Sequence, residues 1–274
     1  MPQYWCFDCE WAPDLLAGRR VYHLSPDVPD DEVMRVMWRE AGATEENPQP
    51  FLKTILCRVV SIAAVVRSVS PTKGVSLALW SVPALGDPLV GEPCVTAAGV
   101  PEADILSAFL GHFEKRQPVL VGFNSRASDL HILLQRAFVN GLQLPNFFKE
   151  SAAKPWNQTS VDLMDFLGGK GKGYTASLNE IANLCGIPGK LDTTGYDVAR
   201  LYYGGKARGV VEYNMFDALT TYLVWLRTEF FAGRFTPKQY AEEQTAVKNL
   251  LEVEKAKPWG AYLQKYVEAW KELE

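Results

Sequence analysis

The segment from Cys57 to Val66, CRVVSIAAVV, is a nearly continuous run of apolar and β-branched residues. Such a run, without polar alternation, is typical of a strand that is buried on both faces at the centre of a sheet. A shorter apolar run from Pro118 to Phe123 predicts a second buried strand. Any fold for this chain therefore has to provide a covered sheet around these two segments.

The remaining patterns predict more strands early in the chain and helices through most of its second half. Strands are expected over residues 5–11 and 75–82, and helices over residues 30–41 (with Asp30 as N-cap), 102–115, 129–140, 177–185, 196–203, 210–231, 236–255 and 258–273. We find neither an internal repeat nor an interdomain linker. This order predicts a single α/β or α+β domain over residues 1–274, in which residues 235–274 form a helical C-terminal extension.

The composition is that of an ordinary soluble globular protein. Of the 274 residues, 47% are hydrophobic and 22% are charged, which excludes a disordered tail, a collagen and a coiled coil. No apolar run reaches the ~18–20 residues of a membrane-spanning helix, and the start of the chain lacks the pattern of a secretory signal. Five cysteines without a dense framework indicate reduced thiols, so we expect a cytoplasmic protein without membrane association.

Charge is distributed unevenly along the chain, whose net charge is −4. The first 50 residues carry ten acidic residues against four arginines, whereas residues 168–208 carry six basic residues against three acidic ones. The missing overall basic field argues against tight non-specific binding of nucleic acid. An acidic site beside a basic segment suits a metal-dependent enzyme that acts on a polyanion, although ordinary variation of surface charge is the simpler explanation of this pattern by itself.

Two carboxylates, Asp8 and Glu10, are two residues apart on the first expected strand. Because strand side chains alternate, both point to the same face, where a divalent cation such as Mg²⁺ would offset their repulsion. The alternative is a solvated edge strand with acidic side chains. A third acid, Asp129, stands at the junction of a strand and a helix, where it can either cap the helix or offer its carboxylate to a metal.

Another polar pattern lies on the long expected helix, where Tyr213 and Asp217 are four residues apart and share one face. A hydroxyl there can orient a water molecule while the carboxylate holds a metal. An ordinary amphipathic helix with a half-buried tyrosine is the alternative, because this spacing is common by chance. Each of these patterns is weak alone, and only their joint order along the chain is specific.

Taken together, the patterns D-x-E, N-x-x-x-x-D and Y-x-x-x-D resemble those of the DEDD superfamily of 3′–5′ exonucleases, in its tyrosine-bearing branch. The chain is most similar to the stand-alone exonucleases related to the proofreading domain of B-family DNA polymerases. Further segments fit this group: residues 161–165 (VDLMD), 177–182 (SLNEIA) and 186–192 (GIPGKLD). The resemblance extends from about residue 4 to about residue 270.

This resemblance implies an α/β fold of the ribonuclease H-like kind, with a mixed central sheet and flanking helices. It implies four metal-binding carboxylates, which fall on Asp8, Glu10, Asp129 and Asp217. These would hold two Mg²⁺ or Mn²⁺ ions about 3.5–4 Å apart, which together stabilise the attacking and leaving oxygens. The water-orienting tyrosine of the family falls on Tyr213.

Contacts to the substrate are implied outside the acidic residues. The asparagine with which the family contacts a single strand falls on Asn124, and a lysine that contacts phosphate falls on Lys190. Lys170 and Lys172, in a Gly/Lys-rich loop, are candidates for further contacts to the nucleic-acid backbone, and a plain surface loop is an equal alternative. Asp162 either holds the metal-binding side chains in place or is an ordinary residue at the end of a strand.

The expected function is metal-dependent 3′–5′ hydrolysis of single-stranded nucleic acid, with DNA favoured over RNA, to nucleoside 5′-monophosphates. The alternatives are a non-catalytic nucleic-acid-binding module and an accessory of a polymerase or repair complex that docks through residues 236–273. The complete set of four acids and a tyrosine argues against both. The sequence departs from the family at Trp11 and Ser128, close to where the terminal nucleotide should lie, which leaves the substrate type and the rate open.

Overall fold

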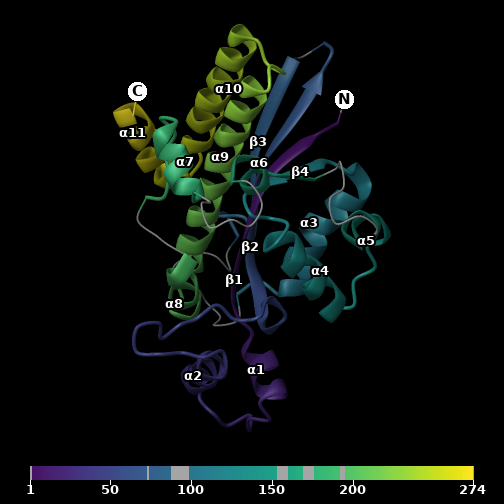
Figure 1. Ribbon diagram of the computed structural model, residues 1–274, viewed down its shortest axis with the longest axis vertical. Coiled ribbons are helices and arrows are strands. Elements are labelled where there is room, and N and C mark those ends of the chain that lie inside the picture. The colour runs from purple at the N-terminus through teal and green to yellow at the C-terminus, as the bar shows by residue number, and fades with distance from the viewer. Residues whose placement is uncertain are drawn as a thin grey trace.

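The computed structural model describes residues 2–72, 74–87, 99–152, 160–168, 176–191 and 195–273. Within these residues, a sheet runs in the order β3-β2-β1-β4-β5 (Figure 1). Its strands are β1 (Tyr4–Pro13), β2 (Cys57–Ser70), β3 (Gly74–Val82), β4 (Val119–Gly122) and β5 (Ser160–Asp162). β2 is antiparallel to β1 and β3, whereas β4 is parallel to β1 and β5 is parallel to β4.

β2 is the buried strand that its apolar run predicts. Val59, Ile62 and Ala64 are completely shielded from solvent, and the strand is paired along both edges. It continues four residues beyond the predicted end, to Ser70. The turn that follows ends at Gly74, whose φ of 71° suits a residue without a Cβ.

Helices cover both faces of the sheet (Figure 1). One face carries α3 (Glu102–Arg116), α4 (Asp129–Val139) and α5 (Pro145–Ala152); the other carries α7 (Leu178–Leu184), α9 (Ala207–Phe231), α10 (Pro237–Lys255) and α11 (Leu263–Leu273). Alternate residues of β1 serve the two faces, since Trp5 and Phe7 pack against α3 while Cys6 packs against α9. The predicted α/β fold class, a mixed central sheet with flanking helices, is confirmed.

α9 runs beside β1 and β2 for 25 residues. It is buried on almost every side, as Leu219, Tyr222 and Trp225 show, which is typical of a core helix covered by others. α10 and α11 supply that cover, so the segment expected as a C-terminal extension is helical and packs on α9. Among the described residues, none of the helices combines the length and apolarity needed to cross a bilayer.

The chain makes a long excursion between the hydrogen-bonded strands β1 and β2. It contains α1 (Leu15–Val21), α2 (Asp30–Glu40) and the 3-10 turn η1 (Thr54–Leu56). α1 and α2 lie together beyond one end of the sheet (Figure 1), whereas η1 contacts α4 and β2. The prediction that Asp30 is the N-cap of α2 is wrong, because Pro29 occupies that position and its side chain makes no capping bond. Asp30 instead accepts a hydrogen bond from Arg19 of α1 at 2.6 Å.

Several short elements were not expected from the sequence. They are β5, α1, α5, α6 (Leu163–Gly168) and the 3-10 turns η1, η2 (Gly195–Asp197) and η3 (Gly260–Tyr262). α8 (Val198–Tyr203) is shorter than the helix predicted over residues 196–203 because η2 precedes it. The described cysteines, Cys6, Cys9, Cys57 and Cys185, are free thiols, as expected.

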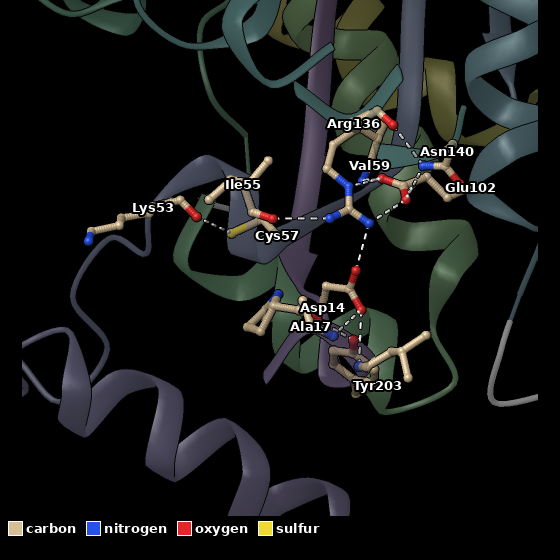
Figure 2. Close-up of polar contacts among 12 residues, drawn as sticks. Asp14, Ala17, Lys53, Ile55, Cys57, Val59, Glu102, Arg136, Asn140 and Tyr203 are labelled. Carbon is tan, nitrogen blue, oxygen red and sulfur yellow. Dashed lines mark hydrogen bonds and ion pairs between the residues drawn. The ribbon is translucent and has the colours of Figure 1, made fainter. Parts of the chain in front are cut away.

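A buried ionic network joins the excursion to the rest of the fold. Figure 2 shows Arg136 of α4 between the carboxylates of Glu102 and Asp14. It donates to both oxygens of Glu102, at 2.8 and 2.6 Å, to Asp14 at 2.6 Å and to the carbonyl of Ile55 at 3.1 Å. Glu102 also accepts the backbone N–H of Val59 at 2.8 Å. The network therefore fixes α4 relative to the ends of β1 and β2.

We expect Arg136→Met to lower the free energy of unfolding by about 3–5 kcal/mol, because it leaves the buried carboxylate of Glu102 without its counter-ion. Urea denaturation followed by circular dichroism measures the change. Arg35→Met is the matched control, since Arg35 pairs with Asp31 on an exposed helix surface, where a pair contributes about 0–1 kcal/mol. Equal effects of the two substitutions would contradict this account.

Candidate metal and catalytic site

The site lies where β1 and β4 separate. β4 pairs with β1 only over Tyr4–Cys6 and ends at Gly122, so no strand within the described part of the chain pairs with the adjoining edge of β1 further on. There the backbone N–H of Cys9 donates to Oδ1 of Asp129 at 3.0 Å. The carboxyl ends of neighbouring strands are where α/β proteins bind ligands. Asp129, the first residue of α4, is thus tied directly to β1.

Three carboxylates from distant parts of the chain meet at this place. Asp8 and Glu10 share the face of β1 that looks toward α9, and Asp217 of α9 faces them. Each offers an oxygen that lies within 4.8 Å of the oxygens of the other two. Glu10 and Asp217 are only 8% and 7% exposed. Asp129 is not one of these three, but its charge acts on both carboxylates of β1, so it borders the same group.

Crowding and burial disfavour the charged form of every carboxyl group in this cluster. Burial, followed by the charges of the neighbouring carboxylates, raises the pKa of Asp8 and of Glu10 well above the usual range. Burial likewise raises the pKa of Asp129 and of Asp217 to about 6. The cluster therefore lacks the positive charge that would stabilise its ionised carboxylates.

This donor set fits a hard divalent cation. It consists of carboxylate oxygens, which Mg²⁺ and Mn²⁺ prefer, and it is largely withdrawn from water. A cation between Asp8, Glu10 and Asp217 would replace repulsion with attraction and favour the ionised form of each group.

Removing one charge tests this repulsion. We expect Asp217→Asn to stabilise the metal-free protein near neutral pH by about 3 kcal/mol, because the pKa of the carboxyl group rises from 3.8 to about 6 on folding. A group with a raised carboxyl pKa binds the extra proton in the folded state, so its contribution to stability falls as the pH rises from about 4 to about 6. The stability difference from the wild type should therefore vanish near pH 4.

Urea denaturation in EDTA at several pH values measures this difference, and saturating Mn²⁺ should reverse its sign. Glu40→Gln, at an exposed end of α2, is the matched control and should show no such pH dependence. A difference for Asp217→Asn that stays constant between pH 4 and pH 7 would rule out the repulsion.

Tyr213 lies one helical turn before Asp217 and is 5% exposed. Its hydroxyl lies near the carboxylate of Asp217 and opposes the rise in the pKa of that group. Burial, followed by the charges of Glu10, Asp217 and Asp8, raises the pKa of the Tyr213 hydroxyl far above its usual value. The group therefore stays protonated and can donate or accept a hydrogen bond, but it cannot act as a base near neutral pH.

Lys190 supplies a positive charge at the rim of the site. Its Nζ lies 5.6 Å from the centre of the Tyr213 ring, and its charge opposes the rise in the pKa of Asp8, Glu10 and Asp217. The side chain itself is exposed. Its backbone N–H donates to Asn179 at 2.7 Å, which anchors the loop beside α7. Lys170 and Lys172 lie outside the described residues.

Asn124 lies in the turn between β4 and α4, in the left-handed conformation with φ 58°. Asp162 at the end of β5 holds this turn, because its carboxylate accepts the backbone N–H groups of Asn124 and Arg126, each at 2.9 Å. Asp162 thus fixes the conformation of the turn from the end of β5. Ser128, a departure from the family pattern, has its hydroxyl 2.7 Å from both the Asn124 carbonyl and Asp129 Oδ2, so it restrains that carboxylate.

Sequence reasoning missed Asn214, which is completely buried and donates to Asp8 Oδ2 at 2.8 Å. The available signal was an amide side chain inside an otherwise apolar stretch of helix, directly after Tyr213. Ser61 of β2 was missed for a similar reason, since a lone serine in a buried strand indicates only that its hydroxyl needs a partner.

Comparison with known proteins assigns the chain to a family. A family model described as "Predicted 3'-5' exonuclease related to the exonuclease domain of PolB" matches residues 49–270. The match includes Asp129, Tyr213 and Asp217, whereas Asp8 and Glu10 precede it and join the site through the fold. No curated protein matches the chain.

Among solved structures, the family B DNA polymerase of the hyperthermophilic archaeon Pyrobaculum calidifontis is similar, with 14% sequence identity and a TM-score of 0.49. The similarity covers 84% of this chain and 25% of the polymerase chain. This chain therefore matches about a quarter of that polymerase.

Proposed function

We propose that this chain, which belongs to the family of predicted 3′–5′ exonucleases related to the exonuclease domain of PolB, hydrolyses single-stranded nucleic acid from the 3′ end and releases nucleoside 5′-monophosphates. DNA is the favoured substrate. The observation that carries the proposal is the meeting of Asp8, Glu10 and Asp217 beside Tyr213, from segments about 200 residues apart.

In this proposal Asp8, Glu10, Asp129 and Asp217 hold two Mg²⁺ or Mn²⁺ ions. When bound, such ions lower the pKa of water and stabilise negative charge on the oxygens of the reacting phosphate. The protonated hydroxyl of Tyr213 holds the attacking water in line with the bond to be cleaved. Water adds its oxygen to phosphorus, the bond from phosphorus to the 3′-oxygen breaks, and a proton passes to that oxygen.

Groups at the rim bind the substrate in this proposal. Lys190 neutralises a phosphate beside the acidic cluster, and Asn124 contacts the terminal nucleotides from the turn before Asp129. Lys170 and Lys172 contact the backbone further from the scissile bond. A free phosphate-rich strand would otherwise be repelled by the carboxylates, so a cation at this rim is needed for binding.

A non-catalytic module on the same fold is the less favoured function. Buried carboxylates with raised pKa values destabilise a metal-free fold near neutral pH, and a binding module gains nothing from them. No described feature favours a polymerase or repair partner, and a role in DNA repair and a cytoplasmic location stay predictions from the sequence.

The proposal is tested with matched single-stranded DNA, single-stranded RNA and blunt duplex DNA, each labelled at the 3′ end. We expect release of labelled mononucleotide from single strands with Mg²⁺ or Mn²⁺, and none in EDTA. Opening one base pair costs ~1.4 kcal/mol, so blunt duplex should react at least about tenfold more slowly.

Three outcomes would count against parts of the proposal. Equal rates on blunt duplex and single strand at moderate salt would contradict the strand preference. Activity that survives EDTA would contradict the role of the metals. Binding of the strands without any degradation would favour the non-catalytic module.

A further inference from the structure

Asn214 is a completely buried amide on α9 to which the proposed reaction gives no task. Its Nδ2 donates to Oδ2 of Asp8 at 2.8 Å. On its other side, the hydroxyl of Ser61 donates to Oδ1 of Asn214 at 3.2 Å, and Ser61 is itself completely buried on β2. The three side chains form a line of hydrogen bonds that runs from β2 through α9 to β1.

The two ends of this amide are not interchangeable. An ionised carboxylate only accepts hydrogen bonds, so Nδ2 is the end of the amide that can face Asp8, while Oδ1 accepts from the Ser61 hydroxyl. The reversed amide would place an oxygen against a carboxylate oxygen and lose the hydrogen bond to Asp8, although the Ser61 hydroxyl could then accept from Nδ2. The side chain of Asn214 is therefore held in one orientation, with its donor fixed on Asp8.

Asp8 needs such a partner more than its neighbours do. It is partly exposed, whereas Glu10 and Asp217 are buried, so repulsion within the cluster can turn it toward solvent. Asp129 is restrained by hydrogen bonds from the Cys9 amide and the Ser128 hydroxyl. Among the described residues, Asn214 is the one hydrogen-bond donor to the Asp8 side chain from another element.

We propose that Asn214 is a positioning residue that sets the orientation of Asp8 for cation binding, an inference that rests on the proposed function. A neutral donor restrains the carboxylate without cancelling its charge, which a lysine or arginine would do. It occupies one lone pair of Oδ2 and leaves the remaining lone pairs of Asp8 for metal ions. Since Asp217 follows three residues later, α9 carries both a carboxylate and the group that directs Asp8.

The test is calorimetric titration of the folded protein with Mn²⁺, which needs no substrate. Asn214→Leu has nearly the same volume and removes both hydrogen bonds, so we expect a 10–100-fold loss of Mn²⁺ affinity. Ser61→Ala keeps the donor to Asp8 and should lose less than Asn214→Leu. In turnover assays, Asn214→Leu should lower kcat and leave KM for the strand nearly unchanged.

Thr228→Val is the matched control, because the Thr228 hydroxyl is also buried on α9 and donates to the Val224 carbonyl at 3.0 Å, away from the site. It should change stability without changing Mn²⁺ affinity. Folded Asn214→Leu with wild-type Mn²⁺ affinity would overturn the inference. If Asn214→Leu does not fold, wild-type affinity in both Asn214→Ser and Ser61→Ala would overturn it equally. Wild-type protein that binds no Mn²⁺ would instead refute the metal site of the proposed function, and this inference with it.

Discussion

Asp8→Ala should abolish detectable Mn²⁺ binding and slow strand degradation on the order of 10³-fold or more. Asp8 belongs to the acidic group, where one of its oxygens lies within 4.8 Å of oxygens of Glu10 and Asp217, and it receives the hydrogen bond from Asn214. Its loss removes a ligand and, with the cation, the charge stabilisation of the transition state. Single-turnover degradation of a labelled strand and calorimetric titration with Mn²⁺ measure the two effects.

A third measurement, the stability of the metal-free variant, tests whether misfolding causes the loss of binding and activity. Removing one of several crowded carboxylates relieves the burial and repulsion that raise the pKa of Asp8, which offsets the loss of the acceptor for the buried Asn214 amide, so the metal-free variant should stay folded with a stability near that of the wild type. Glu252→Ala on the exposed side of α10 is the matched control and should change neither binding nor rate. Wild-type activity of Asp8→Ala would remove the acidic cluster from the mechanism.

The second large effect is expected from Tyr213→Phe, which should slow turnover about 10²-fold, or ~2.7 kcal/mol in the barrier. The hydroxyl stays protonated, because burial raises its pKa far above the usual value, so its contribution is the orientation of water and not proton removal. The variant should keep its fold and most of its Mn²⁺ affinity, since the ring and all four carboxylates remain.

The distinguishing measurement is the rate as a function of pH. If Tyr213 only orients the water, the variant should show the same pH profile as the wild type at a lower rate. Leu219→Ile, a conservative change in the buried part of α9, is the control for small packing effects. Wild-type turnover of Tyr213→Phe would mean that another residue orients the water, and the tyrosine-branch assignment would fail at its defining residue.

The elements that could be predicted are those whose apolar pattern is set by burial alone. β2 is recognisable because both of its faces are covered, so that its residues are apolar without alternation. α9 is recognisable because its pattern extends over too many residues for a strand. α1 was missed although Asp14 caps it at Leu16 and Ala17, because seven residues are too few for a periodic pattern. Asp30 was misassigned because an acid near the start of a helix can occupy the N-cap or the first turn, and the pairing with Arg19 decides between them.

The residues of the candidate site divide in the same way, into those that a local sequence pattern predicts and those that it does not. Asp8, Glu10, Tyr213 and Asp217 are found in the sequence because short spacings on one strand or one helix put the members of each pair on one face. The contacts of Asn214 depend on how α9 sits against β1 and β2, which no local pattern reveals.

The bond from the Cys9 amide to Asp129 gives the site a built-in spectroscopic reporter. Amides inside a strand ordinarily face carbonyl groups, whose charge does not change, whereas this one faces a carboxylate that titrates with a pKa of about 6. The nuclear magnetic resonance of this single proton should therefore follow the ionisation of Asp129, and it tests the cation binding proposed for this carboxylate. If α4 draws back from β1, the same amide becomes open to deuterium exchange, so one resonance distinguishes a closed site from an open one.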